Sequence, residues 1–138
     1  MKHSIVALLF IILGWSTLFA QEKPYNVAFD ITSKDTVDHR MVLRLVSDIT
    51  EMYPNSNVEV VFYGKSLDMV VQGKSMDAET VMNLVKKKNV AFNVCAIAMQ
   101  RNKVEKSQLV PGVKVVPDGI RELVMKQGEG WGYIKVSH

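Results

Sequence analysis

The chain has 138 residues, with 17 basic and 14 acidic side chains, one cysteine and a formal net charge of +3. This near balance argues against nucleic acid as the main partner, and a single cysteine excludes the disulfide-stapled class of small secreted domains. Beyond residue 20 the histidines are His39 and His138, which gives no cluster with metal-ligand spacing, so we expect neither a metal nor another cofactor.

The first twenty residues have the pattern of a secretory signal peptide. A short charged start precedes an apolar run from Ile5 to Leu13, and the segment closes at Ala20. The run is too short to span a bilayer comfortably. We therefore expect cleavage after Ala20, no membrane anchor on the mature protein, and export to the periplasm of a Gram-negative cell or otherwise to the medium.

Residues 21–138 are predicted to form one domain, because their length is that of a typical single domain. Apolar runs rich in β-branched and aromatic residues predict strands, and apolar residues spaced three and four apart predict helices. In chain order we expect a strand over 25–31, a helix over 35–53, a strand over 58–63, a short helix or turn over 67–71, a helix through Val81 and Val85, a strand over 90–95, a short helix to Met99, a strand over 113–116, a helix starting at Pro117 and ending before Gly128, and a strand over 131–136.

This alternation predicts the α/β class: a flavodoxin-like, three-layer domain of about five mostly parallel strands with helices on both faces. The pattern leaves the strand order open. In the last helix, Ile120, Leu123 and Val124 are expected to form the apolar face. The glycine-rich stretch 128–132 lacks the spacing of a nucleotide-binding loop and predicts a helix end followed by a strand.

The carboxyl ends of the strands are where an open α/β sheet binds its ligands. Cys95 ends the third predicted strand and is the one strong nucleophile at that edge. A thiol at the start of the following helix is favoured as the thiolate, which is the form that attacks. Free cysteines are also among the most buried residues and often serve as packing. On position alone, a reactive and a structural role for Cys95 both stay open.

The other candidates for the binding crevice are Asp30, His39, Tyr63, Gly64 and Asn93. Asp30, near the end of the first strand, suits a helix-cap partner and a site residue equally well. His39 lies early in the first helix, where a solvated position is the simpler interpretation, although an imidazole can act as acid, base or anion contact. Tyr63 and Gly64 end the second strand, and Asn93 lies near the end of the third.

Five stretches of the chain are distinctive: 27–31, 58–64, 92–95, 109–120 and 126–135, of which the third ends in Cys95. Together they resemble the DsrE/DsrF-like family. The resemblance covers residues 25 to 136, and its most specific part runs from Leu109 to Ile134. It implies a small α/β domain that assembles into trimers or hexamers. In the best-understood relatives a cysteine accepts a sulfane sulfur as a persulfide and passes it on, and Cys95 holds the corresponding position.

The resemblance therefore implies an exported persulfide carrier or sulfurtransferase with Cys95 as the sulfur acceptor. Its partners would be other copies of the chain and thiol or sulfane-sulfur donor and acceptor proteins. The alternative is a non-catalytic oligomeric module that binds a small ligand or senses redox state, with Cys95 as a structural residue.

Overall fold

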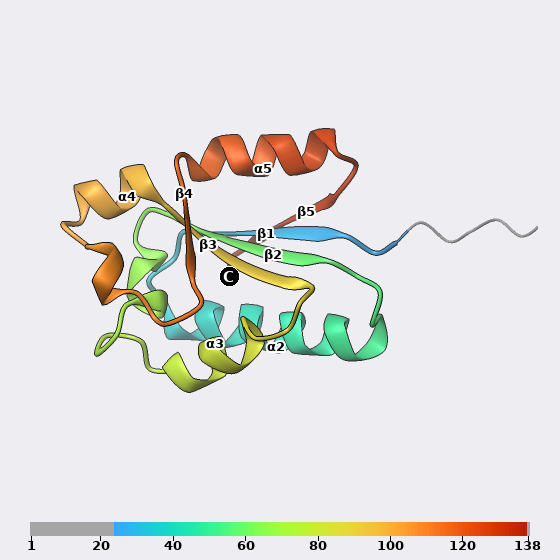
Figure 1. Ribbon diagram of the computed structural model, residues 1–138, viewed down its shortest axis with the longest axis horizontal. Helices are drawn as coiled ribbons and strands as arrows, with labels where there is room; N and C mark the ends of the chain where they lie inside the picture. Colours follow the sequence, from blue (N-terminus) through green and yellow to red (C-terminus); the bar gives the residue numbers. More distant parts are fainter. Residues whose placement is uncertain (1–23, 138) are drawn as a thin grey trace, which may run out of the picture.

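Five parallel strands in the order β4-β3-β2-β1-β5 form the centre of the computed structural model, which describes residues 24–137 (Figure 1). The predicted signal peptide, residues 1–20, lies outside the described residues. The elements in chain order are β1 (Val27–Ile31), α2 (Thr36–Met52), β2 (Val58–Phe62), the 3-10 helix η1 (Ser66–Val70), α3 (Ala78–Leu84), β3 (Val90–Cys95), α4 (Ala96–Arg101), the 3-10 helix η2 (Lys106–Gln108), β4 (Lys114–Val116), α5 (Gly119–Gly128) and β5 (Gly132–Val136).

The predicted α/β class is confirmed, with a parallel sheet between two layers of helices. Both ends of α5 differ from expectation, because Pro117 does not lie in its first turn and Gly128 is its last residue. The helix begins at Gly119, since the carboxylate of Asp118 accepts the backbone N–H groups of Ile120 (2.9 Å) and Arg121 (3.3 Å) and caps the helix there.

The strand order explains how the helices divide between the two faces. From β1 to β4 each strand is added on the same side of its predecessor, and β5 then returns to the far side of β1. Crossovers between parallel strands are right-handed. When the next strand is placed in the opposite direction along the sheet, its connecting helix therefore lies on the opposite face. Figure 1 accordingly shows α2 and α3 on one face of the sheet and α5 on the other.

The two faces of the sheet have different compositions. Toward α2 and α3 the strands present apolar side chains such as Val27, Phe29 and Ile31, which belong to the large hydrophobic core. Toward α5 the apolar cluster is small and consists of Ala28, Val61 and Leu123, with Tyr63 and Trp131 packed against it. The α5 face must therefore hold the polar members of the strands.

The predicted apolar face of α5 is only partly correct. Leu123 is buried, whereas Ile120 and Val124 are 60% and 62% exposed. A single helix lies along this face of the sheet, so only the row of side chains turned toward the strands is covered. Among residues 24–137, none of the helices has the length and apolar character needed to cross a membrane.

Candidate functional site

Cys95 is both the last residue of β3 and the N-cap residue of α4. Its side chain makes no capping hydrogen bond to α4. It lies instead against α5, because a Cβ built on Gly119 would be 3.1 Å from the Cβ of Cys95 and 3.7 Å from its Sγ. The thiol therefore faces the first residue of α5, whereas the sequence indicated the start of the helix that follows it.

This position is the switch point of the sheet. The connection after β3 packs into the core on the α2 side, through Ala98 and Met99 of α4. The connection after the neighbouring strand β4 leads into α5 on the opposite face. Adjacent strands whose connections leave to opposite faces open a crevice at their carboxyl ends, and open α/β sheets bind ligands there. The sequence predicted a site at the carboxyl ends of the strands. The strand order narrows this to the ends of β3 and β4.

A pocket of about 320 Å³ occupies this crevice, and we call it the thiol pocket. Cys95 forms part of its wall with a residue exposure of only 5%, so the pocket is the route by which any reagent would have to approach the sulfur. Among the predicted crevice residues, Tyr63 and Gly64 also line it. The remaining lining residues are Ile97, Ala98, Arg101, Asn102, Asp118 and Ile120.

Sequence reasoning missed Arg101 and Asn102, although a signal for them exists. α4 starts directly after Cys95, and Ala98, Arg101 and Asn102 follow the cysteine by three, six and seven residues. Residues three and four apart are neighbours on a helix, and Arg101 and Asn102 follow Ala98 by these intervals. Any helix beginning at residue 96 thus turns these side chains toward the thiol.

Asp30 organises a group of hydroxyl and ammonium donors beside the thiol pocket. It is buried on the α5 face, where its Oδ2 accepts hydrogen bonds from the hydroxyl of Tyr63 (3.0 Å), the hydroxyl of Tyr133 (2.6 Å) and the Nζ of Lys135 (3.3 Å). Its Oδ1 is buried and has no hydrogen-bond partner within the described residues. Asp30 is thus not a helix-cap partner, because Asp35 caps α2. It orients Tyr63 in the pocket wall.

Burial and the hydrogen bonds to Asp30 both disfavour the ionised forms of the two tyrosines. Burial, followed by the hydrogen bond to Asp30, raises the pKa of Tyr63 well above its usual value. The hydrogen bond to Asp30, followed by partial burial, raises the pKa of Tyr133 to about 12. Near neutral pH both hydroxyls are therefore donors, and Tyr63 presents to the thiol pocket a side chain fixed in position and without charge.

Asn93 and His39 lie outside the thiol pocket. Asn93 is buried in β3 and hydrogen-bonds the buried carboxylate of Glu59, which also pairs with the Nζ of Lys126 at 3.7 Å. His39 is only 6% exposed, so its interpretation as a solvated helix position is wrong. Its Nε2 lies 2.8 Å from the carbonyl oxygen of Ser33, which joins the ring to the loop between β1 and α2.

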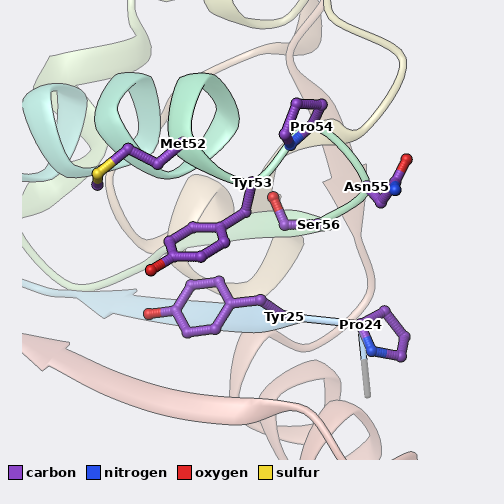
Figure 2. A pocket seen from close by; sticks show the side chains of 7 residues that line it. All are labelled: Pro24, Tyr25, Met52, Tyr53, Pro54, Asn55 and Ser56. Atoms are coloured by element: carbon purple, nitrogen blue, oxygen red, sulfur yellow. The ribbon is translucent and has the colours of Figure 1, made fainter. Parts of the chain in front are cut away.

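A larger pocket, of about 540 Å³, lies at the opposite end of the sheet (Figure 2). It is formed where the chain enters β1 and leaves α2, and the rings of Tyr25 and Tyr53 lie one over the other with centroids 5.1 Å apart and planes tilted by 32°. Its lining holds no thiol, and no ionisable group apart from these phenols. The smaller pocket, which contains the thiol of Cys95, is therefore the better candidate for a reactive site. Within residues 24–137, no group of three or more His, Cys, Asp or Glu side chains could hold a metal ion.

Comparisons with known proteins agree with this geometry. Residues 26–136 match the sequence model of the DsrE/DsrF-like family. The structure of MTH1491 from Methanobacterium thermoautotrophicum, a protein of unknown function, is similar with a TM-score of 0.75 and 26% identity, over 80% of this chain and 98% of that one.

Two further solved structures share the fold at low sequence identity. The ychN protein from E. coli has a TM-score of 0.68 and 13% identity, over 82% of this chain and 99% of that one. BT1422 from Bacteroides thetaiotaomicron has a TM-score of 0.65 and 11% identity, over 81% and 95%. A comparison with curated proteins found no match.

Proposed function

Since the chain belongs to the DsrE/DsrF-like family, we propose that it is an exported sulfur-relay protein in which Cys95 accepts a sulfane sulfur and passes it to an acceptor thiol. One observation carries this proposal: the only cysteine of the chain lines a pocket at the switch point of the sheet. Family membership supports sulfur relay in general, and the position of Cys95 supports its role as the carrier.

The chemistry consists of two displacements at sulfur. The Cys95 thiolate attacks the sulfane sulfur of a donor; a new S–S bond forms, and the donor's bond to that sulfur breaks with the electron pair leaving on the donor. An acceptor thiolate then attacks the outer sulfur of the Cys95 persulfide, and Cys95 leaves as a thiolate. The two steps return Cys95 to its starting state, so the relay requires no external oxidant or reductant.

The pocket limits which groups can take part. Because Cys95 is 5% exposed, donor and acceptor must place a small or extended group inside the thiol pocket. Its volume of about 320 Å³ corresponds to roughly ten water molecules at about 30 Å³ each. This is enough for a small anion or the end of a thiol-bearing chain. The side chains of Ile97 and Ile120 give it partly apolar walls.

The low exposure of Cys95 also favours a second candidate, a non-catalytic module that binds a small ligand or senses redox state. In that case the thiol fills space between β3 and the start of α5. The two candidates differ in whether a reagent reaches the sulfur in the folded protein.

Assembly into trimers or hexamers and export are parts of the same proposal. Assembly is supported by exposed apolar side chains on α5 and on the edge strand β5, which are Ile120, Val124, Met125, Tyr133 and Ile134. A neighbouring subunit would cover them. Sedimentation equilibrium showing a monomer at micromolar concentration would contradict assembly. Export is supported by the pattern of residues 1–20.

Intact-mass spectrometry of residues 21–138 tests the proposed function. We expect incubation with polysulfide to add the mass of one sulfur atom, a reducing thiol to remove it, and Cys95→Ser to show no gain. Alkylation of the native and the denatured protein serves as the control for access. No adduct, together with a thiol that alkylates only after denaturation, would refute the relay and establish Cys95 as a packing residue.

A further inference from the structure

A second depression adjoins the thiol pocket, and Gly64 and Asn102 line both. The side chain of Asn102 donates to the carbonyl oxygens of Gly64 (3.4 Å) and Ala98 (2.8 Å), and so joins the turn after β2 to α4 between the two hollows. The second depression has a volume of about 230 Å³. We call the two hollows together the basic groove.

The name follows from the charges of the lining residues. Lys34, Lys65 and Lys74 line the second depression, and Arg101 lines the thiol pocket. They come from three separate parts of the chain: the loop after β1, the segment from the end of β2 to the turn after η1, and the end of α4. The fold thus gathers four cations around one connected concave surface that ends at Cys95.

The two acidic residues of the groove are already engaged. The Oδ1 of Asp68 pairs with the Nζ of Lys74 at 3.2 Å. The Oδ1 of Asp118 accepts two backbone N–H groups at the start of α5. Asp68 thus neutralises Lys74, whereas Asp118 bonds only neutral N–H groups and keeps its charge, so the four cations exceed the two carboxylates of the groove by two.

Three cations of the groove have no ion-pair partner among residues 24–137. Within the described part of the chain, no carboxylate lies at ion-pair distance from Lys34, Lys65 or Arg101. A cleft with an excess of one sign of charge concentrates counter-ions within it. The planar guanidinium of Arg101 can also hold an oxyanion through two parallel hydrogen bonds. This charge is placed beside the chain's only nucleophilic sulfur.

We propose that the basic groove is a binding site for small sulfur oxyanions, and that such an anion, with thiosulfate as its representative, donates sulfur to Cys95. The donor part of this proposal rests on the relay function proposed above. The sulfonate end of thiosulfate lies toward Arg101 and the lysines, and its outer sulfur points toward Cys95.

The transfer step is balanced in atoms and charge. The Cys95 thiolate attacks the outer sulfur of the thiosulfate dianion and forms a Cys–S–S bond. The bond between the two sulfur atoms of thiosulfate breaks, and sulfite leaves as the dianion with the electron pair. Cys95 is left as the persulfide anion, so one negative charge stays on the protein and two leave with sulfite.

Binding is measured first in Cys95→Ser protein, where no transfer is possible. Titration of thiosulfate, followed by NMR or calorimetry, should show saturable binding. Adding Lys34→Gln, Lys65→Gln and Arg101→Gln should weaken it about tenfold or more, because hydrogen bonds to charged groups are lost. Lys88→Gln is the matched control, since this exposed lysine precedes β3 at the far end of the strand from Cys95.

The loading of sulfur onto Cys95 is measured next, in protein that retains the cysteine. The three groove substitutions should slow loading from thiosulfate about tenfold or more, and should leave unchanged the rate at which Cys95 forms a mixed alkyl adduct with an uncharged dialkyl trisulfide. Absence of thiosulfate binding, or equal weakening by Lys88→Gln, would overturn the basic groove as an anion site. The anion site would also be overturned if the protein does not bind thiosulfate and the three groove substitutions slow loading of Cys95 from a protein persulfide. That result would assign the groove to an acidic surface of a partner protein.

The relay function fails by a different result. Thiosulfate binding in Cys95→Ser protein that depends on the groove cations, without any sulfur gain on Cys95 from any donor, would refute the relay and retain the anion site.

Discussion

Substituting Gly119 by alanine tests the central feature of the site, the packing of Cys95 against the start of α5. The added Cβ would lie 3.0 Å from the Cγ1 of Val61 and 3.1 Å from the Cβ of Cys95. Carbon atoms in contact prefer about 3.5 to 4.0 Å. Either α5 moves away from the sheet, or β2 and β3 give way by several tenths of an ångström, so the wall of the thiol pocket that holds the sulfur must change.

The expected cost follows from two opposing effects. Overpacking a filled interior destabilises a protein by about 1 to 3 kcal/mol. Replacing glycine by alanine also restricts the unfolded chain, which stabilises by about 0.4 to 1 kcal/mol where the backbone permits it. At Gly128, in the last turn of the same helix, nothing lies within 4 Å of an added Cβ. Gly128→Ala is therefore expected to show the stabilising effect alone, and Gly119→Ala to be about 1 to 3 kcal/mol less stable than that control.

Urea unfolding of both alanine variants measures this difference, provided that the two variants have the same m-value, the slope of the unfolding free energy against urea concentration. The alkylation rate of Cys95 in the folded state is the second readout, and we expect it to change in Gly119→Ala and to stay at the wild-type value in Gly128→Ala. Equal stabilities together with equal alkylation rates would refute the packing of Cys95 on α5, and with it the assignment of the thiol to this pocket.

Two further predictions concern the polar residues between the sheet and α5. Lys126→Met should destabilise the protein by about 3 kcal/mol at pH 7, because it leaves the buried carboxylate of Glu59 without its cation. Burial raises the pKa of Glu59, so the folded state binds a proton more readily than the unfolded state, and stability falls as pH rises through the folded-state pKa. The loss of unfolding free energy caused by Lys126→Met should therefore shrink toward pH 4, and it should largely disappear when Glu59→Gln is added. If urea unfolding shows the same loss at pH 4 and at pH 8, this reasoning is wrong. The phenolate absorbance of Tyr133, measured as the difference between wild type and Tyr133→Phe, should appear with a midpoint near pH 12. The stability that the neutral hydroxyl contributes should be lost as pH rises from about 10 to about 12. Asp30→Asn should move that titration toward pH 10, and an unchanged midpoint would show that the hydrogen bond to Asp30 does not cause the shift.

The polar composition of the α5 face has a signal in the sequence. Each of the three central strands carries one polar residue in an otherwise apolar run: Asp30, Glu59 and Asn93. Successive side chains of a strand point to opposite faces. In each strand the polar residue alternates with neighbours that belong to the large core, so all three fall on the other face. Period-two spacing by itself therefore assigns these three residues to the face opposite the large core.

The sequence alone determined the elements and the edge of the sheet at which Cys95 lies. Apolar periodicity and turn residues act over a few positions, so the strands, the helices and the place of Cys95 at the end of β3 could be predicted. The strand order could not, because it depends on which parallel neighbours bury most apolar surface across the whole chain. That order puts the crevice between β3 and β4.

The tertiary structure also decided which residues share the site. Asp30, His39 and Asn93 were expected in the crevice but do not line the thiol pocket, while Arg101 and Asn102 do. Side-chain partners such as Asp30 and Tyr133 are 103 residues apart and meet only because β5 pairs with β1. Local sequence fixes where a strand ends, and long-range packing fixes what it ends beside.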